Sequence, residues 1–201
     1  MIVMNDNVHF ILLAVFLCAL CILGTRFLKN YKFKQLLNCI KNQDVSRFSQ
    51  IANSRLTKLL FPPYNIEYLK LNAFLLEGNE QEIDHQFTKM LDFNLGKTQR
   101  CDLLLKAYDY YLSKRNKKQC KSILKDIKSL EEKELYQDAL KCYLIIFEKS
   151  TKYVDEMESQ LHSIDDKKKS YLEYLLSIQY ENLGNSNKSN FYKEQSLLHS
   201  S

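Results

Sequence analysis

An uncharged stretch near the N-terminus constrains the fold of this chain more than any other feature. Residues 8–24, VHFILLAVFLCALCILG, contain no Asp, Glu, Lys or Arg. As a helix rising about 1.5 Å per residue, the stretch would span roughly 25 Å, near the short end of what crosses a hydrocarbon core about 30 Å thick. Phe27 and Leu28 lengthen the apolar surface, because Arg26 can extend its charge toward the lipid headgroups. The sequence therefore predicts a transmembrane helix over residues 8–28.

A cleaved secretory signal is the alternative to a permanent anchor. Signal peptides begin with a positively charged region, whereas residues 1–7, MIVMNDN, contain no Lys or Arg and one Asp. Cleavage also favours small residues in an A-x-A-like pattern, and residues 24–27 read Gly-Thr-Arg-Phe. Both contrasts favour an uncleaved anchor, with residues 1–7 as a short extracytoplasmic N-terminus.

Basic residues after the apolar stretch predict its orientation. Lys and Arg beside a membrane helix stay in the cytoplasm, so we expect a single-pass protein of the cell membrane with its N-terminus outside and its C-terminal domain in the cytoplasm. Residues 29–60 hold seven bases against one acid, Asp44. Their role is either this topology signal alone or attraction to anionic lipid as well. The bases expected at the membrane surface are Arg26, Lys29, Lys32 and Lys34.

Helix breakers are scarce in the rest of the chain. Four Gly and two Pro occur in 201 residues, and the two prolines are adjacent at Pro62 and Pro63. A sheet protein needs turn residues far more often than this. Apolar residues recur three and four positions apart instead, as at Leu103, Ala107 and Tyr110, which is typical of helices. The predicted fold class is all-α.

The helical segments contain a repeating pattern. Its best copy has Leu, a small residue, an aromatic, a turn Gly and then small residues at Leu176, Ser177, Tyr180, Gly184, Ser189 and Ser196. This pattern resembles the tetratricopeptide repeat (TPR). Equivalent turn positions are Gly78, Arg115, Glu148 and Gly184. They lie about 37, 33 and 36 residues apart, close to the 34-residue unit of that family. The first-helix Trp of the family is absent.

The resemblance implies a right-handed solenoid of α-hairpins over residues 64–201, in which hairpins bury their apolar stripes against each other. Residues 29–63 would form a basic juxtamembrane helical segment, for which a degenerate repeat closed by the two prolines is an open alternative. The relatively polar final helix, residues 187–198, suits the solvent-facing end of the stack. We expect it to cover Tyr174, Ile178 and Phe191.

The same resemblance points to a binding surface, because the first helix of each hairpin would face the concave side. The residues expected there are Asn65, Tyr68, Asn72, Asp102, Leu105, Asp109, Asp138, Tyr171, Tyr174 and Ile178. They carry little positive charge, which favours a neutral or basic peptide as ligand. Packing between hairpins remains the competing interpretation of each residue, since tyrosines at helical spacing usually lie in a core.

Residues that would carry chemistry are not grouped in the sequence. The four histidines lie far from one another and from cysteines, and four glycines leave no phosphate-binding loop. We expect no enzyme activity, cofactor or metal, and no nucleic-acid partner, because the basic residues form no extended face. The six cysteines are expected to be reduced thiols, with lipidation of Cys18 or Cys21 left open.

Together these features predict a membrane-anchored cytoplasmic scaffold whose TPR-like groove binds a protein or peptide partner. A peptide-responsive regulator or sensor is the alternative. An enzyme would require turnover that disappears when Asp109 or Asp138 is replaced. The Lys- and Asn-rich, Gly-poor composition is typical of bacteria with low genomic GC content.

Overall fold

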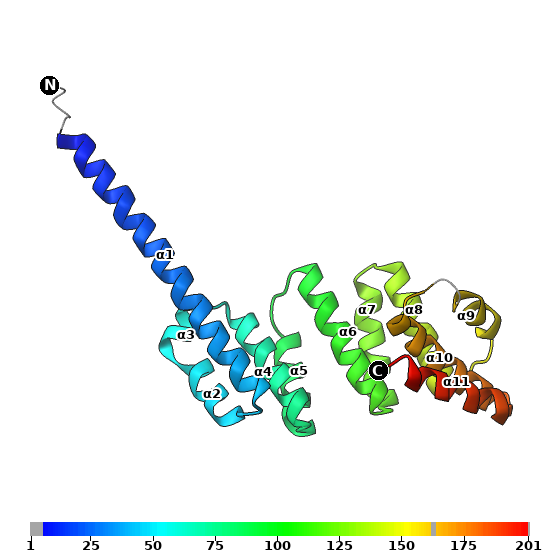
Figure 1. Ribbon diagram of the computed structural model, residues 1–201. Helices are drawn as coiled ribbons and strands as arrows, with labels where there is room; N and C mark the ends of the chain where they lie inside the picture. The colour runs from blue at the N-terminus through cyan, green and yellow to red at the C-terminus, as the bar shows by residue number, and fades with distance from the viewer. Residues whose placement is uncertain (1–5, 162–163, 201) are drawn as a thin grey trace. The chain divides into compact units, whose positions relative to one another are not determined.

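The computed structural model describes residues 6–161 and 164–200, and within them the chain forms helices and no strand (Figure 1). The all-α class predicted from the sequence is confirmed. Residues 1–5 of the expected extracytoplasmic segment lie outside the described residues. The chain divides into two compact units, Met1–Asn94 and Leu95–Ser201, which we describe separately.

The first unit begins with a helix of 36 residues, α1 (Asp6–Lys41), which is drawn as the long blue rod in Figure 1. Its segment Phe10–Lys41 is long and apolar enough to cross a bilayer, and none of its apolar window is buried. Membrane anchors and N-terminal signal sequences share this property. The one hydroxyl near its middle is satisfied within the helix, because Thr25 donates a hydrogen bond to the Ile22 carbonyl at 2.9 Å.

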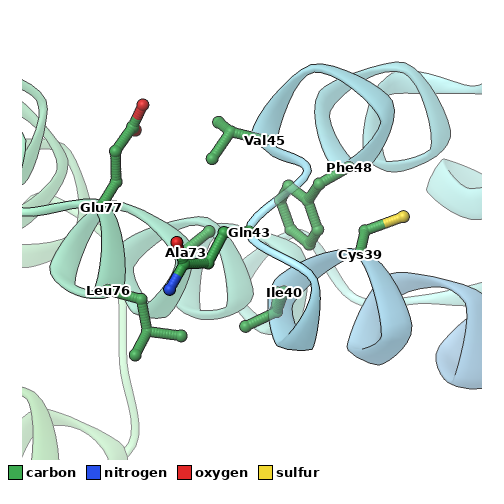
Figure 2. Close-up of a pocket in the computed structure, with 8 residues that line it drawn as sticks. All are labelled: Cys39, Ile40, Gln43, Val45, Phe48, Ala73, Leu76 and Glu77. Carbon is green, nitrogen blue, oxygen red and sulfur yellow. The ribbon is translucent and has the colours of Figure 1, made fainter.

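Four more helices complete this unit: α2 (Val45–Asn53), α3 (Arg55–Leu60), α4 (Pro63–Glu77) and α5 (Glu80–Leu91). The C-terminal third of α1 packs against α2, α3 and α4, so the apolar helix continues without a linker into a folded core. That core consists of Leu36, Cys39, Phe48, Ala52, Phe61, Ile66 and Ala73. Figure 2 shows a cleft of about 140 Å³ beside it, where Cys39, Phe48 and Ala73 approach one another.

A buried polar node joins α4 to α5. The Glu67 carboxylate accepts hydrogen bonds from Gln86 Nε2 at 2.8 Å, Lys89 Nζ at 2.8 Å and Lys70 Nζ at 3.1 Å. Gln86 is buried and also donates to the Glu67 carbonyl at 2.9 Å. Burial alone would raise the pKa of Glu67, but these three donors outweigh it and hold the pKa below its ordinary value.

The described residues of the second unit form six helices: α6 (Lys97–Ser113), α7 (Lys117–Ser129), α8 (Lys133–Phe147), α9 (Val154–Gln160), α10 (Asp166–Asn182) and α11 (Ser186–Leu198). The apolar periodicity of the sequence explains its core, because the residues three and four apart are the buried ones. On α7, Cys120, Ile123, Leu124 and Ile127 all face inward. Helix α7 packs against α6 and α8, whereas α10 packs against α8, α9 and α11.

A second carboxylate that accepts several hydrogen bonds joins the last three helices of this unit. Glu158 Oε1 of α9 accepts hydrogen bonds from Tyr180 Oη at 2.6 Å, Tyr192 Oη at 2.8 Å and Lys188 Nζ at 3.3 Å. The Tyr180 and Tyr192 rings are stacked with their centroids 5.6 Å apart. This node fastens the short helix α9 to α10 and α11.

The turns within successive helix pairs share one backbone conformation, a residue in the left-handed region. A residue with positive φ ends the first helix at Gln43 (55°), Gly78 (76°), Arg115 (54°), Lys149 (55°) and Gly184 (73°). Glu131 has a similar φ of 61° but lies between α7 and α8. After four of the five turns, an Asx side chain caps the next helix by accepting from the backbone N–H three residues later; these caps are Asp44, Asn79, Asn116 and Asn185.

These five turn positions are 35, 37, 34 and 35 residues apart. Three of the turn positions expected from the sequence, at Gly78, Arg115 and Gly184, have this geometry. The fourth was placed one residue too early: the positive φ lies at Lys149, whereas Glu148 has a φ of −108°. The turn departs from the others because Ser150, rather than an Asx residue, follows it.

Candidate functional site: an acidic groove in the second unit

The second unit contains a cleft of about 550 Å³ lined by α6, α8 and α10. Alternate helices of the unit therefore build one surface, while α7 covers none of it. The lining is largely apolar, with two carboxylates, and consists of Leu105, Tyr108, Asp109, Leu112, Ser113, Leu135, Asp138, Ala139, Cys142, Ile146, Tyr171 and Tyr174. We call this cleft the groove.

A smaller and more acidic cleft adjoins the groove and shares Leu135 and Asp138 with it. This acidic cleft has a volume of about 450 Å³, and its remaining lining residues are Lys97, Thr98, Cys101, Asp102, Glu132 and Glu134. Lys97 is the one base among the described residues that line either space, and it is paired with Glu132 at 2.7 Å. The surface from Asp102 to Tyr174 therefore combines apolar walls with net negative charge.

Asp109 is the carboxylate whose charge is least compensated in the groove. Asp109 is exposed, but the apolar and aromatic side chains around it desolvate its carboxylate and raise its pKa, an effect that nearby Lys106 partly opposes. Among the described residues, no side chain donates a hydrogen bond to its carboxylate. An ammonium or guanidinium group entering the groove would supply the missing countercharge.

Hydroxyl groups order the floor of the groove. Tyr108 Oη donates to the Ala139 carbonyl at 2.6 Å and so connects α6 to α8. Tyr171 Oη lies 3.1 Å from Cys142 Sγ and connects α10 to α8. Burial raises the pKa of all three groups, which keeps both phenols and the thiol protonated at neutral pH. The floor is therefore neutral, and the negative charge of the groove comes from its carboxylates.

A third cleft, of about 550 Å³, begins on the other side of Tyr174. Its charged lining residues are mixed in sign: Arg115, Lys193 and Glu181. Arg115 Nη2 donates to Tyr174 Oη at 2.9 Å, so this tyrosine separates the acidic surface from the mixed one. The acidic character thus ends at α10.

The structure brings together most of the residues that the sequence nominates for binding. Leu105, Asp109, Asp138, Tyr171 and Tyr174 line the groove. Asp102 lines the adjoining acidic cleft, and Ile178 lines the third cleft, where it is mostly buried. Asn65, Tyr68 and Asn72 belong to α4 of the first unit and are not among the lining residues of these clefts.

Sequence reasoning missed several groove residues, notably Tyr108, Leu112, Cys142 and Ile146. Their spacing contains the signal that would have found them. Asp138, Cys142 and Ile146 follow one another every four residues, as one face of a helix requires. Extending the stripe from Asp138 along α8 leads directly to the other two.

Comparisons with known proteins found no relative of this chain. No protein-family model, curated protein or solved structure matches the chain at a significant level. Among the described residues, no three His, Cys, Asp or Glu side chains gather in a way that could hold a metal ion.

Proposed function

We propose that this protein is a membrane-anchored, cytoplasmic protein-interaction scaffold whose TPR-like groove binds a basic, partly apolar segment of a partner protein. The observation that carries the proposal is the groove itself. Three helices from successive hairpins line it, its walls are apolar, and the carboxylates of Asp109 and Asp138 line it without a Lys or Arg among the described lining residues. An extended peptide or a helix with Lys or Arg beside Leu or Tyr fits such a surface.

The recurring turns support the TPR-like part of the proposal. Five left-handed turn residues recur every 34 to 37 residues, and four of them precede an Asx cap. A period of 34 residues is that of tetratricopeptide repeats. Such repeats stack into rigid arrays, and rigidity lowers the entropy that binding must overcome.

Charge supports a basic ligand over an acidic one. Asp102, Asp109, Glu132, Glu134 and Asp138 line the two joined spaces against Lys97 alone. An acidic peptide would meet like charges and would leave Asp109 uncompensated. A basic peptide would pair with Asp109 in a partly desolvated site, where an ion pair is stronger than in water.

The proposed role of α1 is to hold this groove at the membrane. Its apolar window is unburied, and the same helix supplies Leu36 and Cys39 to the core of the first unit. Confinement would raise the local concentration of partners that also reside in the membrane. Fusing alkaline phosphatase to the C-terminus tests the topology: we expect no secreted activity, and an active phosphatase would refute the cytoplasmic location.

Photo-crosslinking in intact membranes tests the groove. A benzophenone amino acid is placed at Leu105, inside the groove, and separately at Ser122, which is exposed on α7 outside it. We expect a defined protein adduct from position 105 and none from position 122. The Asp109→Lys/Asp138→Lys variant should lose the adduct, whereas Asp126→Lys, which reverses a charge on α7, should retain it.

Three results would count against the scaffold. The same adduct from positions 105 and 122 would place the partner elsewhere, and no adduct from position 105 would mean that the groove is not a docking surface. An adduct that survives the double charge reversal would remove the electrostatic basis of the proposal. Circular dichroism of each variant shows whether it keeps the helical fold.

A further inference from the structure

The short helix α3 of the first unit buries a polar residue and exposes two leucines, the reverse of the usual pattern. Thr57 is fully buried, and its hydroxyl lies 2.9 Å from that of Ser54. Leu59 is 83% exposed and Leu56 is 38% exposed, and these residues share the outer face because they are three positions apart. A helix surrounded by water would bury its leucines first. The outer face of α3 is therefore suited to an environment other than water.

Charge narrows the choice of that environment. Arg55 directly precedes Leu56 and Lys58 directly precedes Leu59; both bases are exposed, and α3 contains no Asp or Glu. Leucines beside cations are typical of surfaces that enter the boundary between headgroups and acyl chains of anionic membranes. Residues 29–60 as a whole share this basic character.

The contacts of α3 with α1 place this face at the level of the membrane surface. Directly after α3, the Phe61 ring has the ammonium of Lys29 at 5.6 Å and the Phe33 ring at 6.4 Å. Lys29 is the first residue beyond the expected span of residues 8–28, and Phe33 follows it by about one helical turn. The Phe61 ring thus lies beside roughly the first 7 Å of α1 outside the hydrocarbon, a distance similar to the depth of one headgroup layer.

We propose that the outer face of α3, formed by Arg55, Leu56, Lys58 and Leu59, is a membrane-contacting surface that inserts its leucines among anionic lipids. The proposal rests on α1 being a membrane anchor. It assigns α3 a role that the anchor alone does not require: contact at a second place fixes how the first unit is tilted against the bilayer. Figure 1 shows α3 beside α1, between the apolar stretch and α2.

Tryptophan fluorescence can test this contact, because the chain has no Trp of its own. Three full-length variants, each carrying one Trp, are reconstituted into phosphatidylcholine–phosphatidylserine vesicles that contain lipid brominated near the headgroup end of its acyl chains. Leu59→Trp reports on α3. Phe16→Trp reports on the middle of α1, and Leu76→Trp is the matched control, because Leu76 is 60% exposed on α4 of the same unit.

We expect blue-shifted emission from Trp at position 59 and quenching at least about twofold stronger than at position 76, since an interfacial residue lies about 5–10 Å deep. Adding Arg55→Glu and Lys58→Glu, or omitting phosphatidylserine, should reduce this quenching toward the control value. Circular dichroism should show unchanged helicity in every variant.

The remaining outcomes each overturn the proposal in a distinguishable way. Position 16 is read in parallel vesicles whose lipid is brominated near the end of its acyl chains. If position 16 is quenched there and position 59 behaves like position 76, the anchor stands and the α3 contact is refuted. If position 59 is shielded from aqueous iodide but not quenched by lipid, a protein covers α3 instead. If position 16 is not quenched at all, the anchor and the contact fail together.

Discussion

The two units treat a carboxylate that its surroundings desolvate in opposite ways. In the first unit, Glu67 receives hydrogen bonds from Gln86, Lys89 and Lys70, and its pKa is lowered despite burial. In the second unit, Asp109 stands in an apolar groove with no donor among the described residues, and desolvation raises its pKa. A carboxylate that accepts several hydrogen bonds within the protein stabilises the fold. A carboxylate that accepts none is available to pair with the positive charge of a ligand.

Glu158 shows that this difference follows from the site and not from the unit. It lies in the second unit with Asp109, yet it accepts from Tyr180, Tyr192 and Lys188. The hydrogen bond from Tyr180 and those from its neighbours lower the pKa of Glu158. Glu158 therefore belongs with Glu67 as a structural group.

Replacing Glu67 should have the largest effect on stability. Glu67→Ala leaves buried Gln86 without its carboxylate partner and should lower the free energy of unfolding by about 2 kcal/mol. Because the pKa of Glu67 is lowered in the fold, its contribution is present above the ordinary pKa of Glu and is lost as the pH falls through the folded-state value. Urea unfolding of the full chain in detergent measures both.

Exposed Glu77, near the end of α4, provides the matched control for Glu67. Glu77→Ala should change the free energy of unfolding by no more than about 0.5 kcal/mol. Equal losses of unfolding free energy in the two variants would mean that the hydrogen bonds to Glu67 add no stability. The claim that Glu67 is a structural carboxylate, unlike Asp109, would then be refuted.

Replacing Glu158 should have the next largest effect. Glu158→Ala removes three hydrogen bonds at a partly exposed site and should cost about 1 kcal/mol. Because these bonds connect α9 to α10 and α11, hydrogen exchange should accelerate in α9 and less in α6. Exchange that increases equally in both helices would show that the node does not act locally.

Replacing Asp109 should have the smallest effect on stability and the opposite sign. Asp109→Asn removes a desolvated charge and should raise the free energy of unfolding at neutral pH by about 0.5 kcal/mol. The pKa of Asp109 is raised in the fold, so the cost of its charge is complete above the folded-state pKa and vanishes below the ordinary pKa of Asp. The stability curves of the variant and the original chain should therefore converge in acid, and a variant less stable at neutral pH would contradict this account.

Local patterns predicted the helices of this chain well, because burial follows apolar residues three and four apart. Ile83, Phe87 and Met90 of α5, which are four and three positions apart, are all buried. The register implied by the TPR resemblance also nominated five residues that line the groove, since α6, α8 and α10 face one cleft. The buried stripe needed only helical geometry, whereas the groove residues needed the resemblance as well.

Predictions that depended on how far an element extends were less successful. The sequence did not predict that the helix of the apolar span would continue unbroken as α1 to Lys41, which no Gly or Pro in residues 29–41 prevents. The final helix was expected to cover Tyr174 and Phe191, and both remain exposed, whereas Ile178 is buried. Small residues explain part of this result: Ser170 Oγ donates to the Ser196 carbonyl at 2.7 Å, so α10 and α11 meet along serines rather than along those rings.

Binding of matched peptides tests the central claim most directly. An extended peptide of alternating Leu and Lys and its Leu–Glu counterpart are titrated into the full-length protein in neutral detergent, with affinity measured by calorimetry. The account predicts that the Lys peptide binds at least about tenfold more tightly, and that Asp109→Asn with Asp138→Asn removes this preference, since a tenfold change corresponds to about 1.4 kcal/mol from two partly desolvated charges. Equal affinities for the two peptides, or a preference that persists in the double variant, would contradict the claim that the groove selects basic partners.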